Sequence, residues 1–306
     1  MSTPLRLLVA VVAAVGVAGC TGGEPEPAPD TPTSATSSAP TDRDSRAVLA
    51  ALRRIDLCAA VDSGVDARLS STDPFSCDVG TAPNPVKITV VMSSPASRRA
   101  MDAHTLAGAK AYVTREPRLN CRVVLPVSFE LAISVDALGT RPSDALCEPA
   151  SRVATVLAAA LADPVQVEPS WDACGAVRAA VDERDHSQVV PVAMDFCHFP
   201  VGPGQLRLRY ASPPDHAERG VIGDTTVWVS EGEFAGERSC FVDWSLGPPH
   251  TRYAPAGAEF LASVSADECR RARDLARTMV GVLAEPPHEV TPQQPLLYGP
   301  DEPDMP

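Results

Sequence analysis

Two stretches of the chain carry the same pattern of apolar and polar positions, 122 residues apart. In each stretch, small or apolar residues recur at offsets of 0, 3, 7, 10 and 14, which places them on one face of an α-helix. We therefore predict two equivalent helices, each packed closely on a sheet through this face. The residues are Cys147, Ala150, Ala154, Leu157 and Leu161 in the first stretch, and Cys269, Ala272, Ala276, Met279 and Leu283 in the second.

Local signals predict where these two closing helices begin. Pro149 indicates a start near that residue, because proline is favoured at the first helical position. In front of the second helix, Ser265-Ala266-Asp267-Glu268 has the form of a capping box.

Each closing helix is preceded by an opening helix and by short apolar runs. Val48, Leu52, Ile55 and Ala59 predict one face of an opening helix in the first half. In the second half a shorter helix begins at 171–174, with Asp172 as its N-cap. Brief extended segments are expected at 75–79 and 195–199. The runs predict strands at 86–92, 110–114, 121–127 and 129–135, and again at 206–210, 225–230, 240–246 and 261–264.

This order of elements predicts an α+β fold built from two tandem repeats, at 46–163 and 164–284. Each repeat is expected to be a mainly antiparallel sheet packed against its N- and C-terminal helices. Two domains of this size also agree with the length of the chain, 306 residues.

The cysteines follow the same duplication. Cys20 stands alone, and the other eight form two sets of four with similar spacing. Eight cysteines allow 105 pairings, and pairing within each repeat leaves nine. We expect each set to pair first with second and third with fourth, each bond contributing about 3 kcal/mol. The predicted disulfides are Cys58–Cys77, Cys121–Cys147, Cys174–Cys197 and Cys240–Cys269.

The N-terminal residues explain the odd cysteine. A short apolar run at 7–17 is too short to span a bilayer and predicts a signal peptide at 1–19. Val17-Ala18-Gly19-Cys20 resembles a bacterial lipobox, so Cys20 is expected to carry acyl chains, palmitate among them. The alternative is a secreted protein with a chance cysteine. The predicted location is the extracytoplasmic face of the cell membrane, through a lipid anchor.

Two segments have the composition of disordered chain. Residues 20–45 are rich in Pro, Ser, Thr and acids, and we predict a tether there. Residues 285–306 contain many prolines and acids, and we predict a disordered tail. The net charge of −13 and the absence of a basic stripe disfavour nucleic acid as a partner. Arginine is 24 of the 26 basic residues, which indicates a GC-rich, actinobacterial source.

Candidate chemistry is sparse. The sequence has no nucleophile elbow, zinc-protease motif, P-loop or dinucleotide fingerprint, so we predict no catalytic residues, metal or cofactor. Cys197-His198 could suggest zinc, but an exported chain favours the disulfide. Trp228, Phe241 and Trp244 lie on predicted strands. They are core if they face the helices and a candidate binding surface if they face outward.

The order Asp56-x-Cys58, Cys77, Cys121 and Leu146-Cys147-x-x-Ala150, behind a lipobox and tether, resembles a known family. It is the cysteine-rich lipoprotein domain of unknown function that is widespread in actinobacteria. More distantly, the chain is similar to the extracellular sensor domain of mycobacterial serine/threonine kinases. The resemblance implies an exported, anchored α+β domain with paired cysteines, and it transfers no catalytic residue.

Three functions remain open from the sequence. The first is a non-enzymatic envelope lipoprotein that binds or senses a cell-wall fragment, a lipid or a protein. The second is a structural or accessory subunit of an envelope complex. The third is a hydrolase whose site is not recognisable from motifs.

Overall fold

The computed structural model describes residues 40–80, 85–116, 120–139, 143–200, 204–234, 237–285, 287–288 and 290–306. Residues Ala39–Pro306 form one compact unit. The predicted signal peptide at 1–19, the lipidation site Cys20 and the tether up to residue 39 lie outside the described residues, and these stay predictions.

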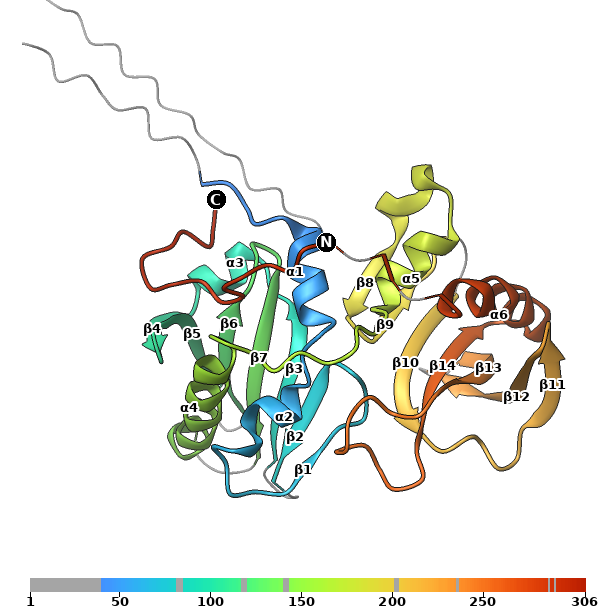
Figure 1. Ribbon diagram of the computed structural model, residues 1–306, viewed down its shortest axis with the longest axis horizontal. Coiled ribbons are helices and arrows are strands. Elements are labelled where there is room, and N and C mark those ends of the chain that lie inside the picture. The colour runs from blue at the N-terminus through green and yellow to red at the C-terminus, as the bar shows by residue number, and fades with distance from the viewer. Residues whose placement is uncertain are drawn as a thin grey trace, which may run out of the picture. The chain divides into compact units, whose positions relative to one another are not determined.

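Repeat 1 contains a seven-stranded sheet in the order β1-β2-β3-β7-β6-β5-β4 (Figure 1), and every strand pair is antiparallel. The predicted strands and the extended segment at 75–79 coincide with five of these strands. The strands are β1 Leu69–Ser70, β2 Ser76–Val79, β3 Val86–Met92, β4 Asp102–Leu106, β5 Ala109–Glu116, β6 Asn120–Pro126 and β7 Leu131–Leu138.

Repeat 2 contains a second seven-stranded antiparallel sheet, in the order β11-β12-β13-β14-β10-β9-β8. Read from β8, this is the strand order of repeat 1. The register agrees as well, since Cys121 pairs with Ala137 and the equivalent Cys240 pairs with Ala266. The strands are β8 Val190–Ala193, β9 Phe196–His198, β10 Gln205–Ala211, β11 Glu218–Ile222, β12 Thr225–Phe234, β13 Glu237–Gly247 and β14 Glu259–Ala266.

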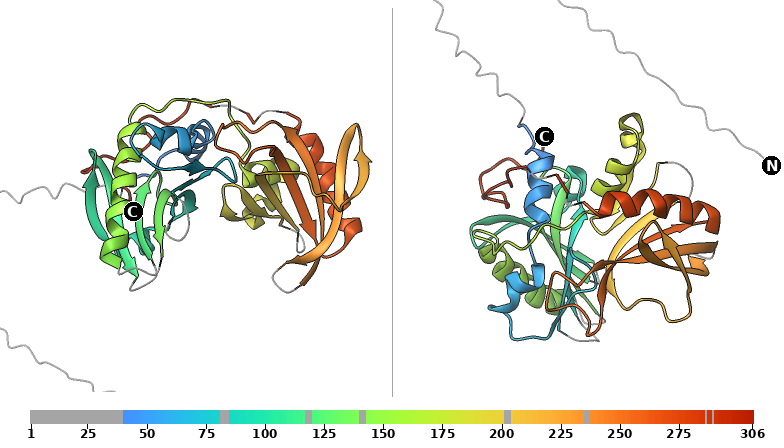
Figure 2. Two further views of the ribbon diagram at one scale, coloured as in Figure 1. Left: turned by 90° about the horizontal axis from the view of Figure 1, so that it is seen from below. Right: turned by 45° about the vertical axis from the view of Figure 1, so that its right-hand side comes forward.

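Helices cover one face of each sheet. In repeat 1, α4 (Ser143–Ala160) packs on β6 and β7, and in repeat 2, α6 (Cys269–Leu283) packs on β13 and β14 (Figure 2). The predicted apolar stripes face inward: Ala150, Ala154 and Leu157 have no exposed surface. The α+β fold and its tandem duplication are therefore confirmed.

The predicted start points of the two closing helices, one near Pro149 and one at a capping box that begins with Ser265, are both wrong. α4 begins at Ser143 and contains Pro149, so the proline lies inside the helix, where it removes one backbone hydrogen bond. The N-cap of α6 is Glu268, whose side chain makes no capping bond. Ser265 cannot serve in a capping box because it still belongs to β14.

The opening helix of repeat 1 is two helices rather than one. α1 (Ser45–Leu52) ends before a turn. α2 (Leu57–Asp62) follows its N-cap Asp56, whose carboxylate accepts hydrogen bonds from the backbone N–H groups of Cys58 and Ala59 at 3.0 Å. Ala59 is exposed, so the predicted single face fails there. The break allows the carbonyls of residues 53 and 54 to accept backbone bonds from residues 170 and 167.

The remaining helices are short. α3 (Pro95–Arg99) connects β3 to β4, and α5 (Ala173–Ala180) opens repeat 2. Asp172 caps α5 as predicted, accepting the N–H of Gly175 at 2.6 Å. A 3₁₀ turn at Glu183–Gln188 follows α5.

All four predicted disulfides are present, Cys58–Cys77, Cys121–Cys147, Cys174–Cys197 and Cys240–Cys269. In both repeats the first bond joins an opening helix to the second strand, and the second bond joins a central strand to the closing helix. Cytosolic thiols are kept reduced, so four such bonds mark an extracytoplasmic protein.

The prediction of a disordered tail at 285–306 is wrong for its described residues. Leu296, Leu297 and Tyr298 are buried, and the first two belong to the core of repeat 1. The backbone also pairs across, since Lys110 donates its N–H to the carbonyl of Tyr298 at 2.8 Å. We call residues 290–306 the C-terminal strap. The strap has too few apolar residues to form a core of its own, and Leu296 and Leu297 pack into the core of repeat 1 instead.

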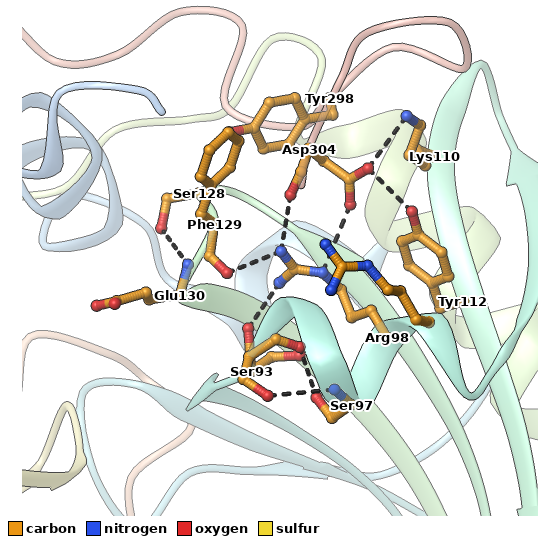
Figure 3. A network of polar contacts seen from close by, with 12 residues as sticks. Ser93, Ser97, Arg98, Lys110, Tyr112, Ser128, Phe129, Glu130, Tyr298 and Asp304 are labelled. Carbon is orange, nitrogen blue, oxygen red and sulfur yellow. Dashed lines mark hydrogen bonds and ion pairs between the residues drawn. The ribbon is translucent and has the colours of Figure 1, made fainter. Parts of the chain in front are cut away.

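The end of the strap is held by a buried charge network (Figure 3). The Arg98 side chain is fully buried and donates to the carbonyls of Ser93, Phe129 and Asp304 at 2.7–2.8 Å. Its Nε lies 3.5 Å from the Asp304 carboxylate. That carboxylate also accepts from Tyr112 at 2.9 Å and from Lys110 at 3.2 Å. Burial and the bond to Asp304 raise the pKa of Tyr112 to about 12.

The strap also binds Arg43, near the start of the described chain. The Arg43 guanidinium donates to the carbonyls of residues 295–297 and to the carboxylate of Glu302. It also stacks over the Tyr298 ring, 3.8 Å from its centre. Residues 42–45, which the sequence placed in the tether, are therefore part of the folded unit.

A buried carboxyl group marks the contact between the two repeats. Burial raises the pKa of Asp195 to about 6, and the charge of Asp73 adds to this, while Arg207 and Lys87 oppose it. Nearby, Tyr210 of repeat 2 donates its N–H to the carbonyl of Thr72 at 2.7 Å.

This carboxyl group makes stability depend on pH. Native Asp195 binds its proton more tightly than unfolded Asp195 does, so its contribution to the free energy of unfolding falls as pH rises from about 4 to about 6. The loss is about 3 kcal/mol, for a pKa raised from 3.8 to about 6. We expect Asp195→Asn to be more stable than the wild type at pH ~7 in urea unfolding, and to lose this advantage at pH ~4.

Asp215→Asn is the matched control, because Asp215 is exposed. It should unfold with the pH profile of the wild type. An Asp195→Asn profile parallel to the wild type would contradict the assignment.

Candidate functional site

The three predicted surface aromatics do not lie together. Trp244 is 1 % exposed and packs in the core of repeat 2, so of the two alternatives the core one is confirmed for this residue and the surface one is not. Trp228 pairs with Asp243, and Phe241 pairs with Ser230, which places both on the opposite, helix-free face of the sheet. Both are half-buried there. They leave no common binding surface with Trp244.

A cleft of about 470 Å³ is lined by residues of both repeats. Repeat 1 contributes α1, the end of β3 and the turn between β6 and β7. Repeat 2 contributes the first turns of α5 and the strand β8 with the residue after it. Both repeats are therefore needed to form the cleft, although the sequence predicts them as two separate domains.

The apolar part of the lining comes from both repeats. Val90 and Met194 are nearly fully buried, while Leu49 and Leu131 are half-buried against the core of repeat 1. Met194 belongs by sequence to repeat 2 but packs within the core of repeat 1. Met92 adds a thioether that is 42 % exposed. Two methionines give the wall side chains that adapt to irregular shapes.

A charged pair crosses the cleft from one repeat to the other. Arg53 Nε on α1 donates to the carboxylate of Asp172 at 2.8 Å, and a second guanidinium nitrogen contacts the same oxygen. Asp172 is 3 % exposed, and its other oxygen caps α5. The pair thus has its hydrogen bonds satisfied and fixes the position of α5 against α1.

Two further arginines line the cleft without a partner of their own. Arg46 on α1 is exposed and Arg178 on α5 is half-buried, and neither side chain has a hydrogen bond or ion pair in the described part of the chain. The other acids of the lining are Asp42 and Glu130. Asp42 accepts from the N–H groups of Arg43 and Phe129 at 2.8 Å and from the Tyr298 hydroxyl at 3.2 Å. Glu130 is exposed.

Sequence reasoning did not find these residues. The Asp172 cap was the one signal that pointed to this place, and it gives the start of α5 but not the partner Arg53. Arg46 and Arg178 stand among many arginines, and nothing in their spacing joins them. Their common cleft exists because two segments more than 130 residues apart are packed together.

A metal centre is not formed by the described residues, since no three His, Cys, Asp or Glu side chains come together there. His198, beside the disulfide cysteine Cys197, lies against the ring of Phe196 at 5.3 Å between ring centres. Within the described ranges, none of the helices has the length and apolarity needed to cross a membrane.

Comparison with known proteins adds little to this site. No protein-family model matches the chain, and no curated protein matches it. Among solved structures, the chain is similar to the immunity protein TplEi of the type VI secretion system of Pseudomonas aeruginosa, solved with an "L" peptide. The identity is 8 %, over 72 % of this chain and 100 % of that chain, and the TM-score is 0.25. A likeness at that level carries no argument about fold or function.

Proposed function

We propose that this protein is an extracytoplasmic lipoprotein, anchored through Cys20, that binds a small ligand in the cleft between its repeats without transforming it. The proposal includes the resemblance to the actinobacterial cysteine-rich lipoprotein domain, which the order of the cysteines carries. The cleft is the observation that carries the binding function.

The cleft has the size and lining of a ligand site. Its volume of about 470 Å³ lies within the range of about 300–1,000 Å³ that is usual for small-molecule sites. Such sites combine an apolar wall with a few placed polar groups. Here Leu49, Leu131 and Met92 provide the wall, and three arginines also line the cleft.

The buried acid of the lining supports binding rather than catalysis. Asp172 is held by Arg53 and by the helix it caps. A general base needs a free lone pair directed at the proton that it removes. Asp172 is instead used to hold α1 and α5 in place.

The anchor rests on the lipobox at 17–20, with small residues directly before the cysteine. Attached acyl chains would hold the protein stably at a membrane surface, since two chains suffice where one binds only marginally. The four disulfides agree with an exported chain.

Native mass spectrometry of the exported chain, purified from the cell envelope, tests this function. We expect an additional mass that disappears on denaturation. Ala193→Phe should reduce or abolish it, because a phenyl ring would occupy part of the cleft and each excluded methylene removes about 0.8 kcal/mol of ligand burial. Ala193 is a half-buried lining residue on β8.

Ala103→Phe provides the control. Ala103 is exposed on the edge strand β4 and does not line the cleft. This variant should retain the bound mass. A bare protein mass for the wild type, together with no binding of added amphiphiles, would overturn the proposed function.

A further inference from the structure

We propose that the ligand is an amphiphile with an apolar body and an anionic head, and that Arg46 and Arg178 hold the head from opposite repeats. This inference rests on the proposed function of the cleft and names the chemistry of its ligand. The anionic group is a carboxylate or a phosphate, because a guanidinium fork matches both geometries.

The first step of the argument is the pair of unpartnered cations. Arg46 belongs to α1 of repeat 1 and Arg178 to α5 of repeat 2, and both line the same cleft. Arg53, the third arginine of the lining, is paired with Asp172. Arg46 and Arg178 keep all their side-chain donors available to a ligand.

The second step is the balance of charge around the cleft. Arg53 neutralises the charge of Asp172. Asp42 accepts three hydrogen bonds, from two backbone N–H groups and from the Tyr298 hydroxyl. Glu130 is the acid of the lining that has no donor on its carboxylate in the described residues, and it is exposed. The lining carries three arginines and three acids, so its formal charges balance, but the side chains of Arg46 and Arg178 have no acceptor among the described residues. An anionic head would supply the acceptor that these two guanidinium groups lack.

The third step is the apolar wall beside the cations. Leu49 and Leu131 are half-buried and present a surface that a hydrocarbon body can cover, and Met92, which is 42 % exposed, extends this surface. A ligand that carried only charge would leave this wall in contact with water. A ligand that carried only hydrocarbon would leave the two guanidinium groups without their best partner. An anionic amphiphile satisfies both halves of the lining.

The test is isothermal titration calorimetry with four twelve-carbon amphiphiles, each below its micelle concentration. The protein is the exported chain carrying Cys20→Ser, so that no attached lipid competes. The probes are dodecanoate, dodecyl phosphate, neutral dodecyl maltoside and cationic dodecyltrimethylammonium. We expect the two anions to bind about tenfold or more tightly than the neutral probe, and the cation to bind weakest. Which anion binds tighter identifies the head group.

Three variants sharpen the test. Arg178→Gln and Arg46→Gln should each weaken the anions about tenfold and leave the maltoside unchanged. Glu130→Gln should tighten the anions, because it removes the opposing charge. Arg184→Gln is the matched control, since Arg184 is 80 % exposed on the 3₁₀ turn, pairs with Asp182 and lies outside the cleft.

The outcomes separate this inference from the function on which it rests. Equal binding of anionic and neutral probes, blocked by Ala193→Phe, would overturn the anionic head and leave the ligand-binding function standing. Binding of none of the four probes would count against both. Loss of anion binding in Arg184→Gln as large as in Arg178→Gln would mean general charge attraction and would overturn the assignment to the cleft.

Discussion

Asp304→Ala is expected to lower the free energy of unfolding by about 3–5 kcal/mol and to release the C-terminal strap. The Arg98 side chain beneath Asp304 has no exposed surface, so removal of the carboxylate leaves a buried charge without its counterion. Lys110 and Tyr112 lose the same acceptor. Urea unfolding measures the loss of stability, and limited proteolysis followed by mass spectrometry reports whether the strap has been released.

Two matched variants define the cause. Asp304→Asn keeps the volume and one acceptor oxygen but removes the charge, so its cost should fall between those of Asp304→Ala and the wild type. Asp301→Ala removes an exposed acid of the same strap and should change stability by less than about 0.5 kcal/mol. If Asp304→Ala and Asp301→Ala cost the same, the strap is not held by the buried pair.

The second large effect is expected from the disulfide between β6 and α4. Replacing both Cys121 and Cys147 by alanine should cost about 3–4 kcal/mol, because the cross-link closes a loop of 26 residues and restricts the unfolded chain. Thermal or urea unfolding of the oxidised proteins measures the difference. The cost should be similar for Cys174 and Cys197, whose separation is 23.

The single variant Cys121→Ala tests whether the cross-link is the cause. It breaks the same bond, so it should cost nearly as much as the double variant rather than half of it. A double variant as stable as the wild type would show that α4 is held on β6 by packing alone. Because Cys121 is fully buried, a cost well above the loop estimate would indicate an added cavity.

Central strands were predictable and edge strands were not. β3 and β6 are apolar runs whose inward residues are buried, and that burial is visible in their composition. β4 has almost only exposed residues, and β8 alternates exposed and half-buried positions. They are strands because each pairs with a neighbour, β4 with β5 and β8 with β9.

Local signals failed where distant segments competed with them. Asp172 capped α5 as predicted because nothing else uses its Oδ1. The predicted helix through Ile55 was broken because residues 166–170 pair with that turn. The composition of residues 290–306 indicated disorder, yet Arg43, Arg98 and Lys110 supply the partners that order it.

The sequence by itself determined the duplication, the α+β class and the inward faces of the closing helices, and it predicted the four disulfides among nine pairings within the repeats. These follow from hydrophobic periodicity and from cysteine spacing, both of which can be read along the chain without knowledge of its packing. Tertiary structure alone decided that the cleft forms and that Arg46 and Arg178 line it without a partner among the described residues. It also decided that Trp244 lies on the other face of its sheet from Trp228 and Phe241, and that the strap packs on repeat 1. Each of these depends on side chains more than 100 residues apart, or on which face of a sheet is covered, and no local pattern encodes either.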